Sequence, residues 1–312
     1  MNEPTESSPS RFRAPRYWPT WALLAVIKVS ARLPAGAQLR LGAMIGRILF
    51  RLNRRERRIA RRNLEICFPE IEAGERERLL RRHFRSVGLS VVEMGVGWFA
   101  PIEELRERVE IRGLEHLDAA LAAGRGALLL TAHFTPIEVG VSVLEDYPGT
   151  ISSLYRPQRN AMMDWLILRG RSRFSSTQVS RDNVRLLIRL LRQNEAVLYM
   201  PDQTYLGNQS AMIPFFGEPA TTNIATSKIA KISGAPVLPY WFRRNADERT
   251  YTVEIESPLE HFPTDDAIAD TRRIVALLEA RIRETPEQYL WVYKKFKRRP
   301  DDFGDPYADA SE

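Results

Sequence analysis

The sequence predicts an α/β fold, with a mixed, mostly parallel sheet flanked by helices and an N-terminal helical region associated with a membrane. Three observations support this prediction. From about residue 108 onward, short apolar runs alternate with segments of helical periodicity. Residues 17–52 are instead apolar and aromatic, with basic residues between them. The chain has 312 residues, 44% of them hydrophobic, which is enough to bury the core of one large domain or of a domain with an appendage.

The composition divides the chain into four expected parts. The N-terminus is polar and contains Pro and Ser, and the segment after Pro300 contains five acidic and no basic residues, so both ends are expected to be flexible. The expected parts are a disordered segment over residues 1–16, membrane-associated helices over 17–52, an α/β domain over 53–300 and an acidic flexible tail over 301–312.

The apolar N-terminal region is too short for a simple membrane span. Eleven helical residues from 17 to 27 would cover about 17 Å, whereas a hydrocarbon core is about 30 Å thick. A second apolar stretch, residues 39–50, is interrupted by two arginines. We therefore expect two amphipathic helices lying in the interface, with Trp18 and Trp21 at headgroup level. One tilted span over about 17–37 is the alternative.

A cleavable signal peptide is less consistent with this region. Residues 34–37 (Pro-Ala-Gly-Ala) resemble a cleavage site, but Lys28 and Arg32 interrupt the apolar segment that should precede it.

Basic residues concentrate in the first third of the chain. Residues 1–85 contain 18 Arg, one Lys and eight Glu, a net charge of +11, and with the whole chain at +7 the remainder carries −4. Seven arginines fall within residues 51–62. Such a distribution indicates an anionic partner, either a membrane surface or a nucleic acid. Motifs for RNA binding and base stacking are absent, so a membrane is favoured. The alternative is that the arginines form an ordinary solvated helix face.

The expected elements follow from periodicity and from turn residues. Residues 70–107 are helical in period, and the helix over 182–193 places Val184, Leu187, Ile188 and Leu191 on one face. Gly234 ends the helix over 223–233. Strands are expected at 109–111, 126–130, 150–155, 196–200, 235–242 and 251–255, and further helices at about 114–123, 136–145, 158–170 and 266–284.

Several chemistries are excluded by what the sequence lacks. Cys67 is the single cysteine, so neither an intrachain disulfide nor a cysteine-cluster metal site can form. No two of the four histidines have metal-ligand spacing. Residues 140–144 lack the second glycine of a nucleophile elbow, and the glycines at 124 and 126 precede a strand where a phosphate-binding loop would follow one. No metal or cofactor is expected.

His133 and Glu138 form the strongest candidate for chemistry. An apolar strand ends just before His133, a helix is expected to start at once, and Glu138 follows five positions later. Imidazole can accept and return a proton near pH 7, and Glu138 could hold the ring in the required tautomer. The structural alternative is a capping box, with Thr135 as the N-cap, Pro136 at the first helical position and Glu138 at the third.

Two more polar residues follow predicted strands. Arg156 comes directly after the strand at 150–155, and Asp202 follows the strand at 196–200. If these strands are neighbours of the strand before His133, all three residues meet at one sheet edge, where open α/β sheets place their sites. Each residue could instead serve only as a turn residue beside proline.

An ordered set of motifs resembles a known family. The set resembles the bacterial late acyltransferases of lipid A assembly, the lauroyl/myristoyl type within the lysophospholipid acyltransferase superfamily, over about residues 17–300. The motifs are residues 60–69 (Ala-Arg-Arg-Asn-Leu-Glu-Ile-Cys-Phe-Pro), 133–138, 155–157 (Tyr-Arg-Pro), 170–173 (Gly-Arg-Ser-Arg), 201–203 (Pro-Asp-Gln), 214–217 (Pro-Phe-Phe-Gly), 220–222 (Ala-Thr-Thr), 234–239 (Gly-Ala-Pro-Val-Leu-Pro) and 286–291 (Pro-Glu-Gln-Tyr-Leu-Trp).

The resemblance implies a function and a site. It implies transfer of a fatty acyl group from acyl carrier protein to a hydroxyl of a lipid A precursor of the Kdo-lipid IVA type, at the cytoplasmic face of the inner membrane. His133 would be the general base and Glu138 its orienting partner. Arg156, Arg171 and Asp202 would shape the acceptor and oxyanion region. Alternatives are acylation of another glycolipid or phospholipid, such as a phosphatidylinositol mannoside, and a non-catalytic protein that binds membrane surfaces.

Overall fold

A seven-stranded sheet forms the centre of the computed structural model, which describes residues 9–308 except 145–146, 148–150, 174–176 and 205–206. The strand order is β1-β9-β8-β2-β5-β3-β4, and of the neighbouring pairs only β8 and β9 run antiparallel. The predicted mixed, mostly parallel sheet is thereby confirmed. The strands are β1 (Val109–Arg112), β2 (Ala127–Leu130), β3 (Ile151–Tyr155), β4 (Gln178–Ser180), β5 (Ala196–Tyr199), β8 (Val237–Arg244) and β9 (Tyr251–Ile255).

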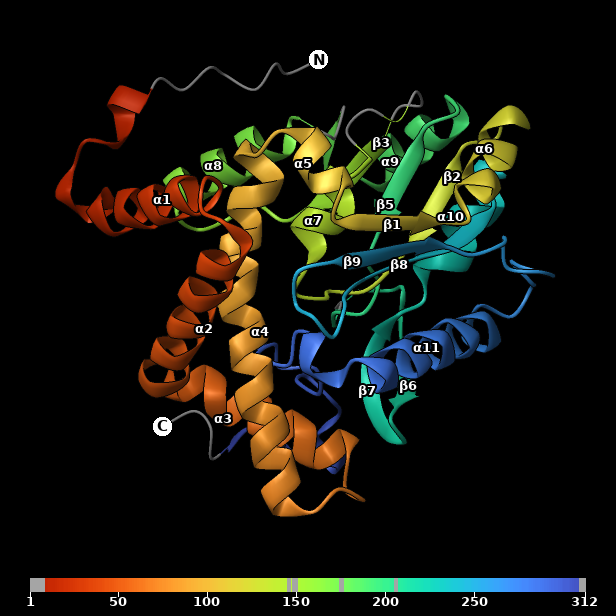
Figure 1. Cartoon of the computed structure of the whole chain (residues 1–312). Helices are drawn as coiled ribbons and strands as arrows, with labels where there is room; N and C mark the ends of the chain where they lie inside the picture. Colours follow the sequence, from red (N-terminus) through yellow and green to blue (C-terminus); the bar gives the residue numbers. More distant parts are fainter. Residues whose placement is uncertain (1–8, 145–146, 148–150, 174–176, 205–206, 309–312) are drawn as a thin grey trace.

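The helices of the α/β part lie close to their predicted positions and flank the sheet (Figure 1). They are α6 (Leu114–Ala122), α7 (Ile137–Ser142), α8 (Ala161–Arg171), α9 (Val184–Arg192), α10 (Ala225–Ser233) and α11 (Ala267–Glu284). Successive side chains of β8 point to opposite faces. The Tyr240 hydroxyl donates to the carbonyl of Gly140 in α7, whereas Trp241 lies 5.6 Å from the guanidinium of Arg281 in α11. Helices α7 and α11 therefore cover opposite faces of the sheet.

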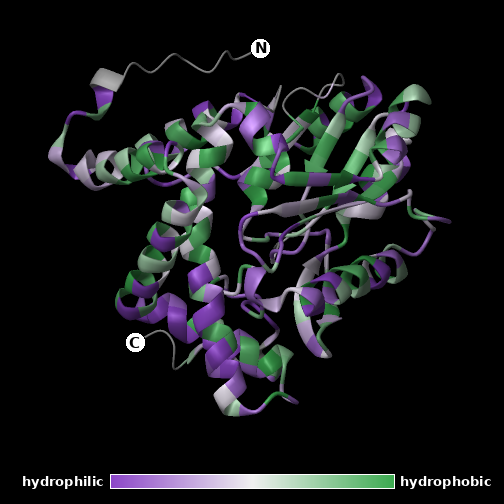
Figure 2. Ribbon diagram, in the orientation of Figure 1, coloured by the Kyte–Doolittle hydropathy of each residue, from purple (hydrophilic) through white to green (hydrophobic). Residues whose placement is uncertain are grey.

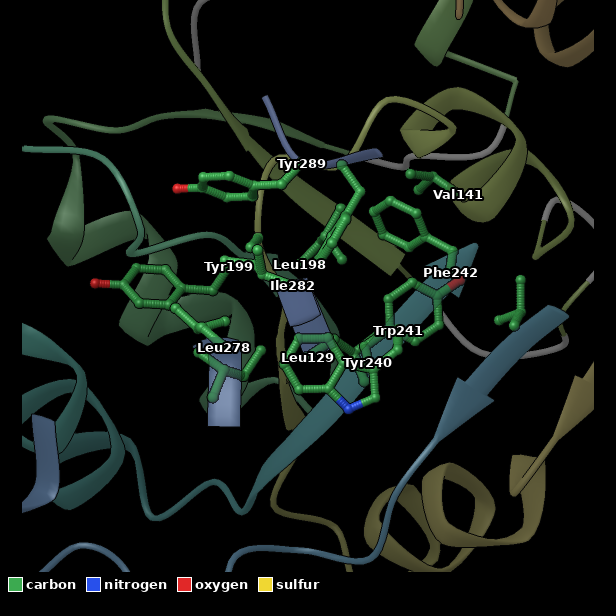
Figure 3. Close-up of a cluster of buried hydrophobic side chains, with 14 of the residues drawn as sticks. Leu129, Val141, Leu198, Tyr199, Tyr240, Trp241, Phe242, Leu278, Ile282 and Tyr289 are labelled. Carbon is green, nitrogen blue, oxygen red and sulfur yellow. The ribbon is translucent and has the colours of Figure 1, made fainter. Parts of the chain in front are cut away.

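Buried apolar side chains fill both sides of this sheet. Leu129 and Leu198 from the central strands are fully or almost fully buried, as are Leu278 and Ile282 from α11 (Figure 3). Figure 2 shows that the central strands are largely hydrophobic. Hydrophilic residues are concentrated where α3 and α4 lie side by side. Because β2 is buried along its whole length, it holds the residues that follow it in a fixed place.

The N-terminal third is helical and packs beside the sheet domain. Its helices are α1 (Trp18–Ser30), α2 (Ala35–Leu52), α3 (Arg54–Cys67), α4 (Ala73–Phe99) and α5 (Ile102–Arg106). Glycines allow α2 to approach α4 closely: a Cβ at Gly88 would lie 2.2 Å from the carbonyl oxygen of Gly42 and 2.3 Å from the nitrogen of Gly46.

Two separate helices were predicted for residues 17–52, and two are present. A turn separates α1 from α2, so residues 17–37 do not form one continuous helix. Within the described part of the chain, no helix is both long enough and apolar enough to cross a bilayer.

The described ends of the chain are more ordered than expected. Pro9–Phe12 and Pro15–Tyr17 form short 3-10 helices, and Phe12 is buried against Met162 and Leu166. At the other end, Asp301–Phe303 is a 3-10 turn and Tyr307 is fully buried, where its hydroxyl donates to Asn63 in α3. One aromatic side chain anchors each segment. Residues 1–8 and 309–312 lie outside the described residues.

Three strands were not predicted. These are β4 and the antiparallel hairpin of β6 (Ser210–Phe215) and β7 (Glu218–Asn223), which forms a separate two-stranded sheet. Prolines within the hairpin and polar residues along β7 obscure the alternation that marks a half-buried strand.

Candidate active site

Three predicted residues meet at the carboxyl edge of the sheet. His133 follows β2, Asp202 follows β5 and Arg156 follows β3, and β5 pairs in parallel with both of the other strands. The strands are therefore neighbours, as the sequence argument required. His133 and Arg156 line one cavity, and Asp202 contacts His133 from behind.

His133 and Asp202 form a hydrogen-bonded pair. Nδ1 of His133 lies 2.6 Å from Oδ1 of Asp202, and the backbone N–H of His133 donates to Oδ2 at 3.2 Å. The hydroxyl of Tyr289 donates to the same Oδ2 at 3.1 Å. Asp202 is 2% exposed, whereas 27% of the His133 side chain remains exposed. A carboxylate at Nδ1 fixes the tautomer in which Nε2 is free to accept a proton.

Asp202 is ionised in this setting. Burial alone would raise the pKa of its carboxyl group, but the charge and hydrogen bonds of His133, together with the charge of Lys295, lower the pKa below its usual value. Tyr289 remains a proton donor, because burial and the neighbouring Asp202 raise the pKa of its hydroxyl well above the ordinary value.

Glu138 does not contact His133 in the described structure, contrary to the expected pairing. Its carboxylate accepts a hydrogen bond from Nε1 of Trp98 at 2.8 Å and is held by Arg171, whose Nε lies 3.1 Å from Oε1. The Glu138 side chain points to α4 and α8, because Trp98 of α4 and Arg171 of α8 bind its carboxylate. Arg171 likewise binds Glu138 and is not among the residues that line the cavity around His133.

The structural alternative, a capping box, is also absent from the described residues. Pro136 is the N-cap of α7 and makes no side-chain capping bond, while the Thr135 hydroxyl lies 2.6 Å from that of Ser86 in α4. Glu138 therefore ties together three helices and does not cap one.

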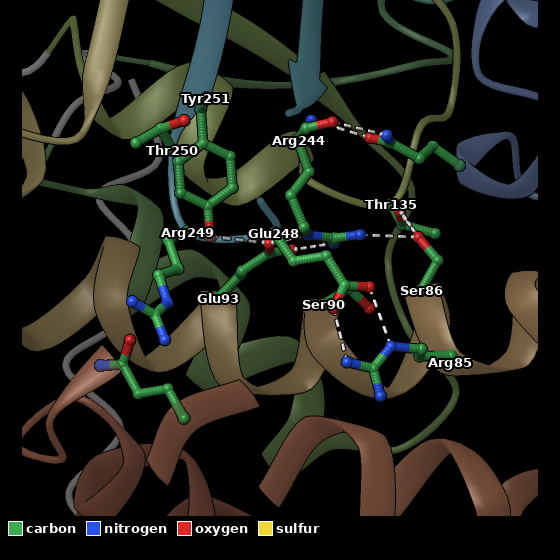
Figure 4. Close-up of polar contacts among 12 residues, drawn as sticks. Arg85, Ser86, Ser90, Glu93, Thr135, Arg244, Glu248, Arg249, Thr250 and Tyr251 are labelled. Atoms are coloured by element: carbon green, nitrogen blue, oxygen red, sulfur yellow. Dashed lines mark hydrogen bonds and ion pairs between the residues drawn. The ribbon is translucent and has the colours of Figure 1, made fainter. Parts of the chain in front are cut away.

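A polar network holds the loop that carries His133. The backbone N–H of Leu290 donates to the carbonyl of His133 at 2.9 Å, and that of Thr135 donates to the carbonyl of Gln288 at 2.7 Å. Figure 4 shows how the network continues through Ser86 to Arg244, whose guanidinium is paired with Glu93. The histidine is thus fixed from the C-terminal segment and from α4.

A cavity of about 570 Å³ opens beside His133. One wall is apolar and comes from α9, α10 and the ends of β3 and β5, and basic residues stand among these. The apolar lining includes Leu154, Val184, Leu187, Ile188, Met200, Ile229 and Ile232, and the basic residues are Arg156, Arg181, Arg185 and Lys228. An apolar chain attached to a polar or anionic head would suit this lining.

Two site residues were missed by the sequence argument. Tyr289 lies within the motif at 286–291, which was noted without a role, and Lys295 follows that motif. Neither follows a strand, so position in the sequence alone did not connect them with Asp202. Among the described residues, no group of three or more His, Cys, Asp or Glu side chains could hold a metal ion.

Comparisons with known proteins place the chain among acyltransferases of lipid A biosynthesis. The family model described as bacterial lipid A biosynthesis acyltransferase matches residues 6–298. A lipid A biosynthesis palmitoleoyltransferase of Escherichia coli (strain K12) is 37% identical over 295 residues, covering 93% of this chain and 94% of that protein. A lipid A biosynthesis lauroyltransferase of the same organism is 35% identical, covering 92% and 94%. A myristoyltransferase of that pathway is 26% identical, covering 95% and 92%.

Proposed function

Because this chain belongs to the bacterial lipid A biosynthesis acyltransferase family and is an acyltransferase, we propose that it moves a fatty acyl group from an acyl carrier protein thioester to a hydroxyl of a Kdo-lipid IVA-type precursor. The observation that supports this reaction is the hydrogen-bonded pair of His133 and the buried Asp202, which lies at the edge of a cavity with an apolar wall.

The reaction begins at Nε2 of His133. This nitrogen takes the proton of the acceptor hydroxyl as its oxygen attacks the thioester carbonyl carbon. The new C–O bond gives a tetrahedral oxyanion, and the imidazolium that forms is stabilised by the Asp202 carboxylate at Nδ1. The C–S bond then breaks, and the leaving sulfur takes the proton from His133 and departs as a thiol. A base placed in this way contributes about 10²–10⁴-fold to the rate.

Arg156 is the side chain we assign to the oxyanion. It follows β3 and lines the same cavity as His133, so its guanidinium can face charge that develops beside the imidazole. Arg171 takes a different role from the one expected, because its guanidinium is already paired with Glu138. We assign Glu138 and Arg171 to holding α7, the helix after His133, against α4 and α8.

The cavity accommodates the acyl donor. Its apolar wall between α9 and α10 would bury the fatty chain, with the thioester toward His133. The basic residues Arg181, Arg185 and Lys228 would face an acidic carrier protein or the phosphates of the acceptor.

Helices α1 and α2 would place the enzyme on the cytoplasmic face of the inner membrane. Trp18 is 64% exposed and Leu52 is 72% exposed, and Val29, Met44 and Ile48 are also large apolar residues on the surface of these helices. Exposed apolar residues beside the arginine-rich α3 suit an interface with anionic headgroups, where each Arg contributes about 1 kcal/mol.

A reconstituted reaction tests the proposal. The purified chain is incubated with a Kdo-lipid IVA-type acceptor and either acyl carrier protein thioesters or acyl-coenzyme A, and the lipid is measured by mass spectrometry. We expect a gain of one acyl group from the carrier thioester and none with His133→Ala. Acylation of a phosphatidylinositol mannoside but not of the lipid A precursor would refute the acceptor. Full function of His133→Ala would refute the catalytic assignment and favour a membrane-binding role.

A further inference from the structure

Lys295 is a buried cation on the far side of Asp202 from the cavity. Its side chain is 2% exposed, and Nζ donates a hydrogen bond to the backbone carbonyl of Asp202 at 2.7 Å. The same Nζ lies 4.7 Å from the centre of the Phe215 ring. No direct ion pair with the Asp202 carboxylate is formed within the described residues, so the positive charge acts through space and through the backbone.

The segment that carries Lys295 is fixed at several points. The Thr204 hydroxyl donates to the carbonyl of Lys295 at 2.9 Å, which joins this segment to the loop that begins at Asp202. The next residue, Phe296, donates its N–H to the hydroxyl of the buried Tyr307 at 3.0 Å. A long, flexible side chain is therefore held at one place behind the His133–Asp202 pair.

A buried carboxylate requires a compensating positive charge. Taking an ion out of water costs several kcal/mol unless an opposite charge or hydrogen bonds offset that cost. A general base must start the reaction neutral, and while His133 carries no charge the positive charge that lowers the pKa of Asp202 comes from Lys295. The charges of Asp202 and Lys295 each favour the ionised form of the other.

We propose that Lys295 is a positioning residue of the acyl transfer, which keeps Asp202 ionised and its backbone in place so that Asp202 can orient His133 and stabilise the imidazolium. This inference rests on the proposed function. Lys295 does not touch the cavity around His133, so its effect reaches the reacting atoms only through Asp202.

The surroundings of Lys295 predict a pH dependence. Burial lowers the pKa of its ammonium group to about 8, although the charges of Asp202 and Glu279 act in the opposite direction, and the buried Cys67 thiol beside it stays protonated because burial raises its own pKa. As the pH rises through this value the ammonium loses its proton, and the positive charge that stabilises the Asp202 carboxylate is lost. The rate of the wild-type enzyme should therefore fall on the alkaline side of the pH profile near pH 8.

Two substitutions separate charge from packing. Lys295→Met keeps an unbranched apolar side chain and removes the charge, and we expect kcat to fall about 10- to 100-fold with KM within about threefold, since only part of the base catalysis is lost. Lys295→Arg keeps a charge at all accessible pH values, and its rate should no longer decline near pH 8. Lys297→Met is the matched control, because it removes one cation from the same segment, where Lys297 lies over Tyr293.

The outcomes are distinct. The inference is overturned if Lys295→Met has the kcat and pH profile of Lys297→Met. If Lys295→Met does not fold, Lys295→Arg decides: an alkaline decline identical to that of the wild type excludes the role of Lys295. Activity that survives in His133→Ala would instead defeat the proposed catalytic function. An inactive His133→Ala together with wild-type behaviour of both Lys295 variants would defeat this inference alone.

Discussion

Two ion pairs join α4 to the hairpin formed by β8 and β9, and they should differ greatly in their effect on stability. Arg244 of β8 is paired with Glu93 at 2.7 Å, and these side chains are 3% and 4% exposed. Eight residues earlier in α4, Arg85 is paired with Glu248, but these side chains are 40% and 32% exposed (Figure 4). The perturbation is the same at both sites: Glu93→Gln and Glu248→Gln, which remove one negative charge at nearly constant volume.

The magnitudes follow from burial. Glu93→Gln leaves the Arg244 guanidinium buried without its counter-charge, and removing one partner of a buried pair costs about 3–5 kcal/mol. Water cannot replace the lost counter-charge, because both side chains of this pair are buried. Glu248→Gln opens a pair that water already reaches, and such pairs contribute roughly 0–1 kcal/mol. At about 2–4 °C per kcal/mol, Glu93→Gln should lower Tm by roughly 6 °C or more.

Thermal unfolding of both variants, followed by circular dichroism in the same detergent and at the same scan rate, tests this reasoning. A double variant, Glu93→Gln with Arg244→Met, should recover part of the loss because the unpaired charge is gone. Equal Tm values for the two single variants would refute the argument from burial. A double variant less stable than Glu93→Gln would show that the network acts through its hydrogen bonds and not through charge.

Three further outcomes are expected. Asp202→Asn should lower kcat by about 10³–10⁴-fold in initial-rate assays, because the wrong tautomer of His133 is then favoured; a loss smaller than tenfold would contradict the pair. Glu138→Gln should cost about 1–3 kcal/mol of stability and reduce kcat less than tenfold, because the Glu138 carboxylate holds three helices together. A large loss of kcat at unchanged Tm would instead show that Glu138 takes part in catalysis. Trp18→Asp and Leu52→Asp should each weaken co-sedimentation with anionic vesicles by at least about tenfold. Unchanged sedimentation would refute the proposed contact of α1 and α2 with the membrane.

The sequence predicted which residues meet but not how they pair. Strand ends can be read from apolar runs, so His133, Arg156 and Asp202 were expected at one sheet edge, and β2, β3 and β5 are neighbours. Glu138 is bound by Trp98 of α4 and Arg171 of α8, and the short spacing between His133 and Glu138 does not reveal these distant partners.

Elements with weak patterns were harder to predict. The hairpin of β6 and β7 contains Pro214 and Pro219 at facing positions, and three-residue β4 is too short for a period. The contributions of Tyr289 and Lys295 depend on a C-terminal segment that returns to the sheet edge from far along the chain. No local sequence pattern predicts the path of this segment. Its path depends on packing contacts with distant residues, such as that of the buried Tyr307 with Asn63.

Helix α4 connects the proposed membrane-facing helices with the loop that carries His133. On one side it packs against α2, so closely that there is no room for a Cβ at Gly88. On the other side Ser86 contacts Thr135, two residues from His133, and Trp98 contacts Glu138. Interior packing is too dense to absorb a displacement of α4 locally. Docking of α1 and α2 on a lipid surface would therefore act on the helix that also positions His133, the proposed base. The geometry of the proposed acyl transfer and the attachment to the membrane would then depend on one element.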